Sequence, residues 1–149
     1  MPKKPTAVDA QIIMQLYDLR REPEMRKARS WFGGSFWPAS AEEVMQVLTA
    51  FDKPENAWFR QVHGYWEMAA SFVLRGVLNE ELFFDNGGEL WFVLAKVYPY
   101  LKEFRVKAQV PRYFQQAERL ATRTKQGRER LHAMVKRQEA MRARAARAS

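Results

Sequence analysis

The chain has 149 residues but no cysteine, and its only histidines are His63 and His132. The absence of cysteine excludes a disulfide framework, a thiolate nucleophile, and zinc or iron–sulfur sites with cysteine ligands. Two histidines without a His-Glu-x-x-His motif do not make a zinc site. The sequence therefore predicts no metal, no cofactor and no catalytic residues, and we expect a protein that is not an enzyme.

A long hydrophobic run is also missing. The apolar stretches within 68–74 and 90–95 are far shorter than the roughly 20 residues that a membrane span needs. Near the N-terminus, Asp9 and Gln11 interrupt the apolar stretch from Ala7 to Leu16, and no small-residue cleavage site follows, so the pattern is not that of a signal peptide. Because a chain without cysteine suits a reducing compartment, we expect a soluble, cytoplasmic protein with no membrane span.

The alternation of apolar and polar residues that predicts β-strands is absent as well. Apolar residues instead recur at spacings of three and four, Ser40 begins a capping box, and Gly76 is placed to end a helix in the left-handed conformation. The predicted fold class is all-α, an irregular bundle of about six or seven helices with a long C-terminal helix. The predicted helices cover about 7–21, 23–32, 41–51, 54–75, 80–84 and 89–107, with a last helix from 111 to the alanine-rich end.

Nearly all of the net charge lies at the C-terminal end. Residues 122–149 contain nine Lys or Arg and two acidic residues, a net charge of +7, whereas the remaining 16 basic and 15 acidic residues nearly cancel. We therefore predict a helical domain over 1–121 and a basic helical extension of the last helix over 122–149. Unbroken from 112 to 146, that helix would be about 50 Å long, so part of it would project or pack on another chain. A bend near Gly127 is the alternative, because glycine costs about 1 kcal/mol relative to alanine in a helix.

Within this segment an arginine recurs at every seventh residue, at Arg123, Arg130, Arg137 and Arg144. This spacing predicts one basic helical face. Two copies of such a face would repel each other across a thin apolar seam, so a homotypic coiled coil through the tail is disfavoured. We expect the face to engage an acidic protein partner. The alternatives are non-specific binding of nucleic-acid phosphates, contact with an anionic membrane surface, and a solvated tail without a partner.

A second group of candidate residues involves the predicted central helix. His63 and Glu67 are four residues apart and share one helical face, and a buried Glu67 would need a partner such as Arg105 or Arg75. We interpret His63, Glu67 and Arg105 as a structural polar cluster. The alternative is that they line a pocket for a small ligand.

Four aromatic residues surround a glycine pair in the stretch 31–38. We interpret these rings as a cap on the core of the bundle. The alternative is an exposed hot spot for another protein, because Trp is enriched at such sites.

Several short segments of the chain resemble segments of the proteins in a known family. They are Tyr65-Trp66-Glu67-Met68-Ala69, the stretch from Arg75 to Leu82, Trp91, Tyr98-Pro99-Tyr100-Leu101 and Arg105. In these segments the chain resembles a family of uncharacterised, all-helical bacterial proteins classed as a domain of unknown function. The resemblance covers roughly residues 17–120. It implies a helical bundle of bacterial origin and no activity, and the basic tail lies outside it.

Overall fold

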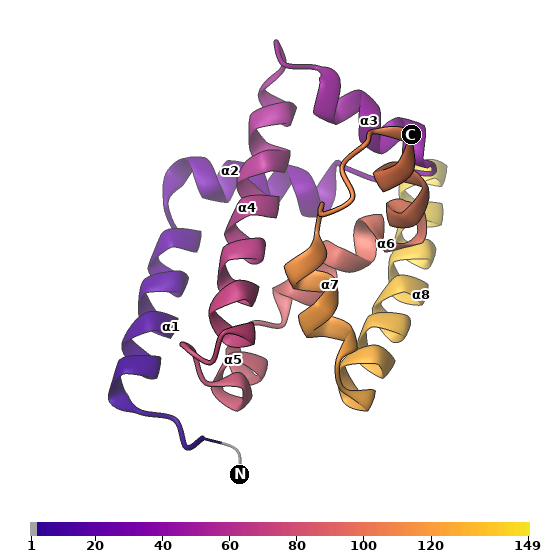
Figure 1. The fold of residues 1–149 in the computed structure, drawn as a ribbon. Coiled ribbons are helices and arrows are strands. Elements are labelled where there is room, and N and C mark those ends of the chain that lie inside the picture. The colour runs from indigo at the N-terminus through magenta and orange to yellow at the C-terminus, as the bar shows by residue number, and fades with distance from the viewer. Residues whose placement is uncertain (1–2) are drawn as a thin grey trace.

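The computed structural model describes residues 3–149, and these residues form eight α-helices and no β-strand. The all-α fold and the long C-terminal helix predicted from the sequence are confirmed (Figure 1). The count is eight because the last predicted helix is divided in two. The helices are α1 (Ala7–Arg20), α2 (Pro23–Gly34), α3 (Ala41–Thr49), α4 (Pro54–Leu74), α5 (Glu80–Asn86), α6 (Glu89–Lys107), α7 (Gln115–Thr122) and α8 (Lys125–Ala148).

Side-chain caps fix most of the helix starts. The Thr6 hydroxyl accepts from the backbone N–H of Asp9 at 3.3 Å, and the Asp9 carboxylate accepts from the N–H of Thr6 at 2.7 Å. Ser40 accepts from the N–H of Glu43 at the start of α3. Gly76 follows α4 with a φ of +71°, the left-handed conformation that favours glycine. These local signals explain why the predicted bounds agree closely with the structure.

Helix α4 lies at the centre of the bundle, with α1 on one side and α7 on the other (Figure 1). The buried side chains of α4, among them Asn56, Phe59, Val62 and Tyr65, cover one broad side of the helix, whereas Arg60, Gln61 and Met68 on the opposite side are exposed. The hydroxyl of Tyr65 on α4 donates to the carbonyl oxygen of Leu16 on α1 at 2.6 Å and ties these two helices together. The buried side of α4 packs against α2, α3 and α7.

The aromatic stretch 31–38 belongs to the core. Helix α2 includes both glycines of the stretch and ends at Gly34. Phe32 and Phe36 are buried, and each ring contacts the ring of Phe59 on α4, with centroid distances of 5.6 and 5.5 Å. The interpretation of these rings as a core cap is confirmed for Phe32 and Phe36, and Trp31 packs against the same core, whereas Trp37 is only half-buried.

The last predicted helix is not continuous from 111 to the alanine-rich end, and the structure instead agrees with the alternative of a bend near Gly127. Residues 111–114 form turns, and Phe114 takes a left-handed conformation with a φ of +59° immediately before α7. Helix α7 ends at Thr122, and Thr124 caps a new helix by accepting from the N–H of Gly127 at 3.0 Å. The chain therefore turns ahead of Gly127, and α8 packs back against α6 instead of extending α7.

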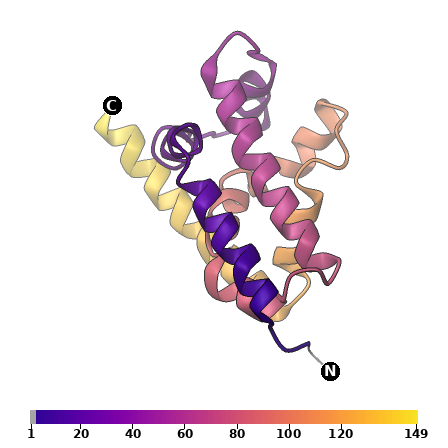
Figure 2. The same cartoon turned by 90° about the vertical axis from the view of Figure 1, so that its left-hand side faces the viewer.

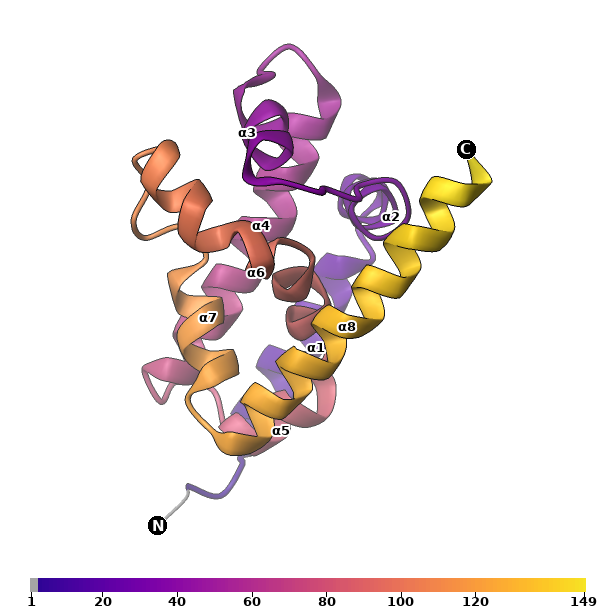
Figure 3. The same ribbon diagram turned by 90° about the vertical axis from the view of Figure 1, so that its right-hand side faces the viewer.

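The two opposite side views show α8 along one side of the bundle, with its C-terminal turns at the far end from the N-terminus (Figures 2 and 3). Within residues 3–149 no helix combines the length and the apolar composition that crossing a membrane requires.

Candidate functional site

Helix α8 is attached to the body of the protein along its inner face. Leu131 is buried in the core. At the start of the helix, the indole N–H of Trp91 donates to the carbonyl oxygen of Gly127 at 3.1 Å. Further along, the side-chain amide of Gln138 donates to the carbonyl oxygen of Phe92 at 2.8 Å. These contacts hold α8 at a fixed position on α6.

The C-terminal half of α8 has its own attachment. The guanidinium of Arg142 donates to the carbonyl oxygen of Pro38 at 3.3 Å and also to the hydroxyl of Tyr100. Arg142 is half-buried, so one of the basic residues of the tail serves the fold and is withdrawn from the exposed surface. The last turns of α8 are therefore supported by the loop after α2.

The structure separates the four heptad arginines into two pairs. Arg123 lies between α7 and α8, where its guanidinium pairs with the carboxylate of Glu80. The guanidinium carbon of Arg130 lies 4.6 Å from the centroid of the Trp91 ring, and Arg130 is half-buried. Arg123 and Arg130 thus already have partners within the chain.

Arg137 and Arg144 are exposed on α8, as are Lys136 and Arg147. We call these four residues the basic face of α8. Among the described residues, no carboxylate lies within 4.0 Å of any of them, whereas other cations of the chain pair with carboxylates across the bundle, as Arg29 does with Glu89 at 3.0 Å. Of the four arginines at the heptad spacing, only Arg137 and Arg144 are therefore exposed without a partner within residues 3–149.

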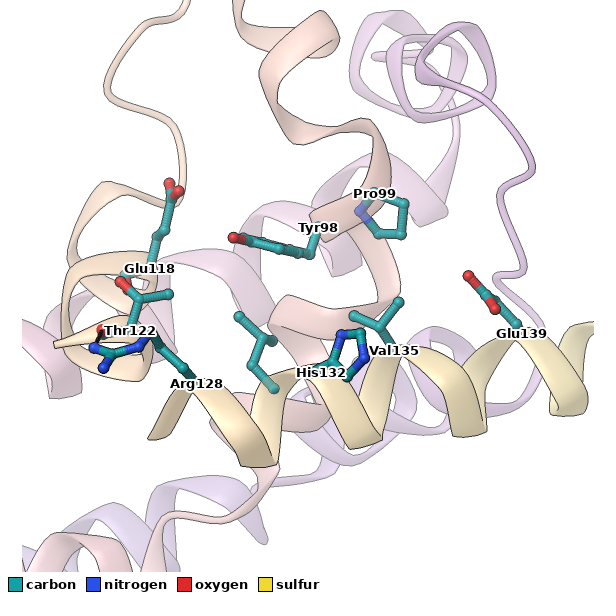
Figure 4. Close-up of a pocket in the computed structure, with 9 residues that line it drawn as sticks. Tyr98, Pro99, Glu118, Thr122, Arg128, His132, Val135 and Glu139 are labelled. Atoms are coloured by element: carbon teal, nitrogen blue, oxygen red, sulfur yellow. Dashed lines mark hydrogen bonds between the residues drawn. The ribbon is translucent and has the colours of Figure 1, made fainter. Parts of the chain in front are cut away.

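A groove of about 520 Å³ runs beside α8, between this helix, α7 and the middle of α6 (Figure 4). Tyr98 and Pro99 of α6 and apolar residues of α8 form part of its lining, and polar or charged residues of α7 and α8 form the rest. The lining residues are Tyr98, Pro99, Glu118, Thr122, Arg128, Leu131, His132, Val135 and Glu139.

Two of the charged groups in this groove are already engaged. The carboxylate of Glu118 pairs with Arg105 at 2.5 Å, and the guanidinium of Arg128 donates to the carbonyl oxygen of Thr122 at 2.8 Å. His132 and Glu139 are exposed and form no ion pair within residues 3–149. This groove could not be predicted from the sequence because it depends on the turn between α7 and α8. One sequence signal did point to part of the groove: residues 128, 132, 135 and 139 are spaced three or four apart and so share one face of a helix.

The structure brings His63, Glu67 and Arg105 together around the start of α7. Glu67 accepts from the backbone N–H of Gln116 at 3.2 Å and of Ala117 at 2.8 Å. Burial raises the pKa of the Glu67 carboxyl, and these two N–H donors, followed by the Arg105 charge, act in the opposite direction. The carboxylate therefore caps a helix that has no cap of its own.

The other two members of this cluster hold the loop that precedes α7. The His63 ring stacks on Tyr113 with a centroid distance of 3.9 Å and accepts from the N–H of Phe114 at 3.3 Å. Burial lowers the pKa of His63 to about 4, so the ring is neutral and can accept. Arg105 donates to the carbonyl oxygen of Tyr113 at 2.9 Å. These contacts support a structural role for the cluster.

Arg75, the other partner considered for Glu67, is exposed at the end of α4. No group of three or more His, Asp or Glu side chains in the described part of the chain is arranged to hold a metal ion.

The chain matches one family model over residues 5–124. The match ends at the residue that caps α8, so α8 itself lies outside it. No curated protein and no solved structure matches the chain significantly. The all-helical fold and the extent of the match agree with the resemblance seen in the sequence. The chain belongs to the family described as "Domain of unknown function (DUF4760)".

Proposed function

We propose that this protein is a binding protein without catalytic activity that engages an acidic protein partner through the basic face of α8. The observation that carries this proposal is the set of four exposed cations, Lys136, Arg137, Arg144 and Arg147, for which the chain supplies no carboxylate within residues 3–149. Because α8 is attached to the body through Gln138 and Arg142, these charges are presented on a rigid element. A partner would not have to order a flexible tail, which lowers the entropic cost of binding.

The exposed side of α8 also allows another chain to approach closely. Ala133, Ala140 and Ala143 are exposed between the cations. Small side chains leave room for a second helix, and the arginines beside them offer planar donors that suit carboxylates. An acidic helix therefore matches this surface in both shape and charge.

Two observations favour an acidic protein over nucleic acid. The exposed side of α8 has no Trp, Tyr or Phe on which a base could stack. At the start of α8, a hollow of about 530 Å³ is lined by Glu80, Glu81 and Asp85 together with Thr124 and Gln126. Phosphates that continued along the helix would meet these carboxylates, whereas a partner that binds only the C-terminal half would not.

The test compares two double variants with the same change in charge. Arg137→Glu/Arg144→Glu reverses the basic face, and Lys102→Glu/Arg112→Glu reverses two exposed cations elsewhere. Each immobilised protein captures partners from a cell extract with and without nuclease treatment, at low and at physiological salt. The captured protein is then purified and its affinity measured. Circular dichroism checks that both variants are folded.

We expect the first variant to lose about tenfold or more in affinity and the second to bind like the unmodified chain. Binding of the unmodified chain should weaken as salt rises, because exposed charges are screened. Capture that disappears after nuclease treatment would instead identify nucleic acid as the ligand. An equal affinity of both double variants would contradict the assignment of the site to the basic face.

A further inference from the structure

Lys96 is a buried amine without an acidic partner. It lies in α6, is only 4% exposed, and has no carboxylate within 4.0 Å among the described residues. Its Nζ donates to the carbonyl oxygen of Gly33 at 3.3 Å. Three ring faces surround the same nitrogen, with centroid distances of 3.4 Å to Trp37, 5.3 Å to Phe92 and 5.9 Å to Phe32. Lysine is almost never buried in this way unless it is paired.

Lys96 lines a small cavity between α6, α8 and the loop after α2. The cavity has a volume of about 20 Å³, and Tyr100, Gln138 and Arg142 also line it. Gln138 is only 5% exposed, and its Oε1 has no hydrogen-bond partner. A buried amine and a buried, unpaired acceptor therefore face one space that can hold a small polar group.

The surroundings of Lys96 favour the neutral amine. Burial lowers the pKa of Lys96 to about 7, because removal from water disfavours the ammonium form. The ring faces partly oppose this effect, since they attract a cation. A substantial share of the amine still carries a free electron pair near pH 7.5, whereas an ordinary lysine, with a pKa of about 10.4, is almost fully protonated there.

We propose that Lys96 is a site of reversible modification by carbon dioxide, which adds to Nζ to form a carbamate. The electron pair of Nζ attacks the carbon of CO₂, and one C=O π pair moves to its oxygen. One N–H proton then passes to solvent, so the products are Lys–NH–COO⁻ and H⁺. No oxidation or reduction takes place, and CO₂ is the only co-reactant.

Apart from the carboxylate of Glu139, which also lines the cavity, its polar groups complement each part of a carbamate. The new N–H group is a donor, and the unpaired Oε1 of Gln138 is an acceptor on the same cavity. The new carboxylate is an acceptor, and the guanidinium of Arg142 and the hydroxyl of Tyr100 are donors there. Arg142 uses only part of its five N–H groups on Pro38 and Tyr100, so donors remain for the carboxylate. A cavity of this volume leaves no room for large electrophiles.

The experiment is ¹³C NMR of the full chain at pH 7.5 in buffer equilibrated with ¹³C-bicarbonate. We expect a carbamate resonance that exchanges with dissolved ¹³CO₂ and is absent from Lys96→Met. Lys102→Met removes an exposed lysine of the same helix and should keep the resonance. The α-amino group also reacts with CO₂, because its usual pKa is about 7.7–8.0. The resonance that remains in Lys96→Met is therefore that of the α-amino carbamate.

Unfolding of the unmodified chain supplies a second measurement that needs no variant. In urea at the same pH, Lys96 returns to its ordinary pKa, so its resonance should fall at least tenfold while the α-amino resonance persists. The proposal is overturned if the folded chain shows only the α-amino carbamate. It is equally overturned if the second resonance survives in Lys96→Met or in urea.

Discussion

Trp91 of α6 donates its indole N–H to the carbonyl oxygen of Gly127 in α8 across 3.1 Å. The same ring lies 4.6 Å from the guanidinium carbon of Arg130, one turn further along α8. Trp91 is completely buried. A single side chain in the family-matched part of the chain therefore fixes the start of the helix that lies beyond it.

We expect Trp91→Phe to destabilise the protein by about 2–4 kcal/mol. The change leaves the buried carbonyl of Gly127 without its donor and weakens the cation–π contact with Arg130, and it also opens a small cavity. Urea unfolding measures the loss, and amide hydrogen exchange should show faster exchange in α8 than in α4. The half-buried Trp58 provides the control, because Trp58→Phe removes no hydrogen bond of this kind. Similar losses for the two variants would argue against a special role for the Trp91–Gly127 bond.

Alanine should have opposite effects at two glycines of the chain. A Cβ atom added to Gly127 would lie 2.4 Å from the carbonyl oxygen of Ala121, so Gly127→Ala should cost about 1–3 kcal/mol. A Cβ atom added to Gly64, in the middle of α4, would meet no atom within 4 Å, and Gly64→Ala should stabilise the protein by about 0.5–1 kcal/mol. Thermal unfolding of both variants checks the signs. A stabilising Gly127→Ala would show that the α7–α8 turn relaxes easily.

Much of the fold could be predicted because its signals are local. The caps at Thr6 and Ser40 and the left-handed Gly76 each act within a few residues, so the sequence reveals them directly. The buried character of α4 was equally visible in its apolar residues. The burial of Phe32 and Phe36 agrees with the interpretation of the aromatic stretch 31–38 as a cap on the core.

The remaining features depend on contacts between distant residues. Thr124 lies among strong helix formers, and the turn it caps is stabilised by Trp91, 36 residues away from Gly127. Arg123 and Arg130 share the heptad spacing of Arg137, but Glu80 and the Trp91 ring engage them. The sequence did contain one signal for the buried amine, since Lys96 is the single charge in the apolar run 90–97.

Glu67→Gln should destabilise the protein by about 1–3 kcal/mol. The carboxylate accepts from the N–H groups of Gln116 and Ala117, and an amide offers only one oxygen to these two donors. Chemical unfolding gives the difference. Glu24→Gln is the matched control, because Glu24 is exposed and pairs only with Lys27, so its loss should stay within about 0.5 kcal/mol. Equal stability of Glu67→Gln and the unmodified protein would remove Glu67 as the cap of α7.

His63 should make stability depend on pH between about 6.5 and 4. Its pKa is lowered to about 4 in the folded protein, so in this window the unfolded chain binds the proton and the folded one does not. Stability therefore falls as the pH falls, by up to about 1.4 kcal/mol per pH unit, and this effect vanishes above pH 6.5. The raised pKa of Glu67 gives a pH dependence of the unfolding free energy with the opposite sign. The effect of His63 is therefore measured by comparing the pH profile of a His63 variant with that of the unmodified chain. His63→Gln should flatten the pH profile of the unfolding free energy, whereas His132→Gln, at an exposed position on α8, should leave it unchanged. Parallel profiles for His63→Gln and the unmodified chain would show that the pKa of His63 is the same in the folded and the unfolded chain, and would contradict the lowered value.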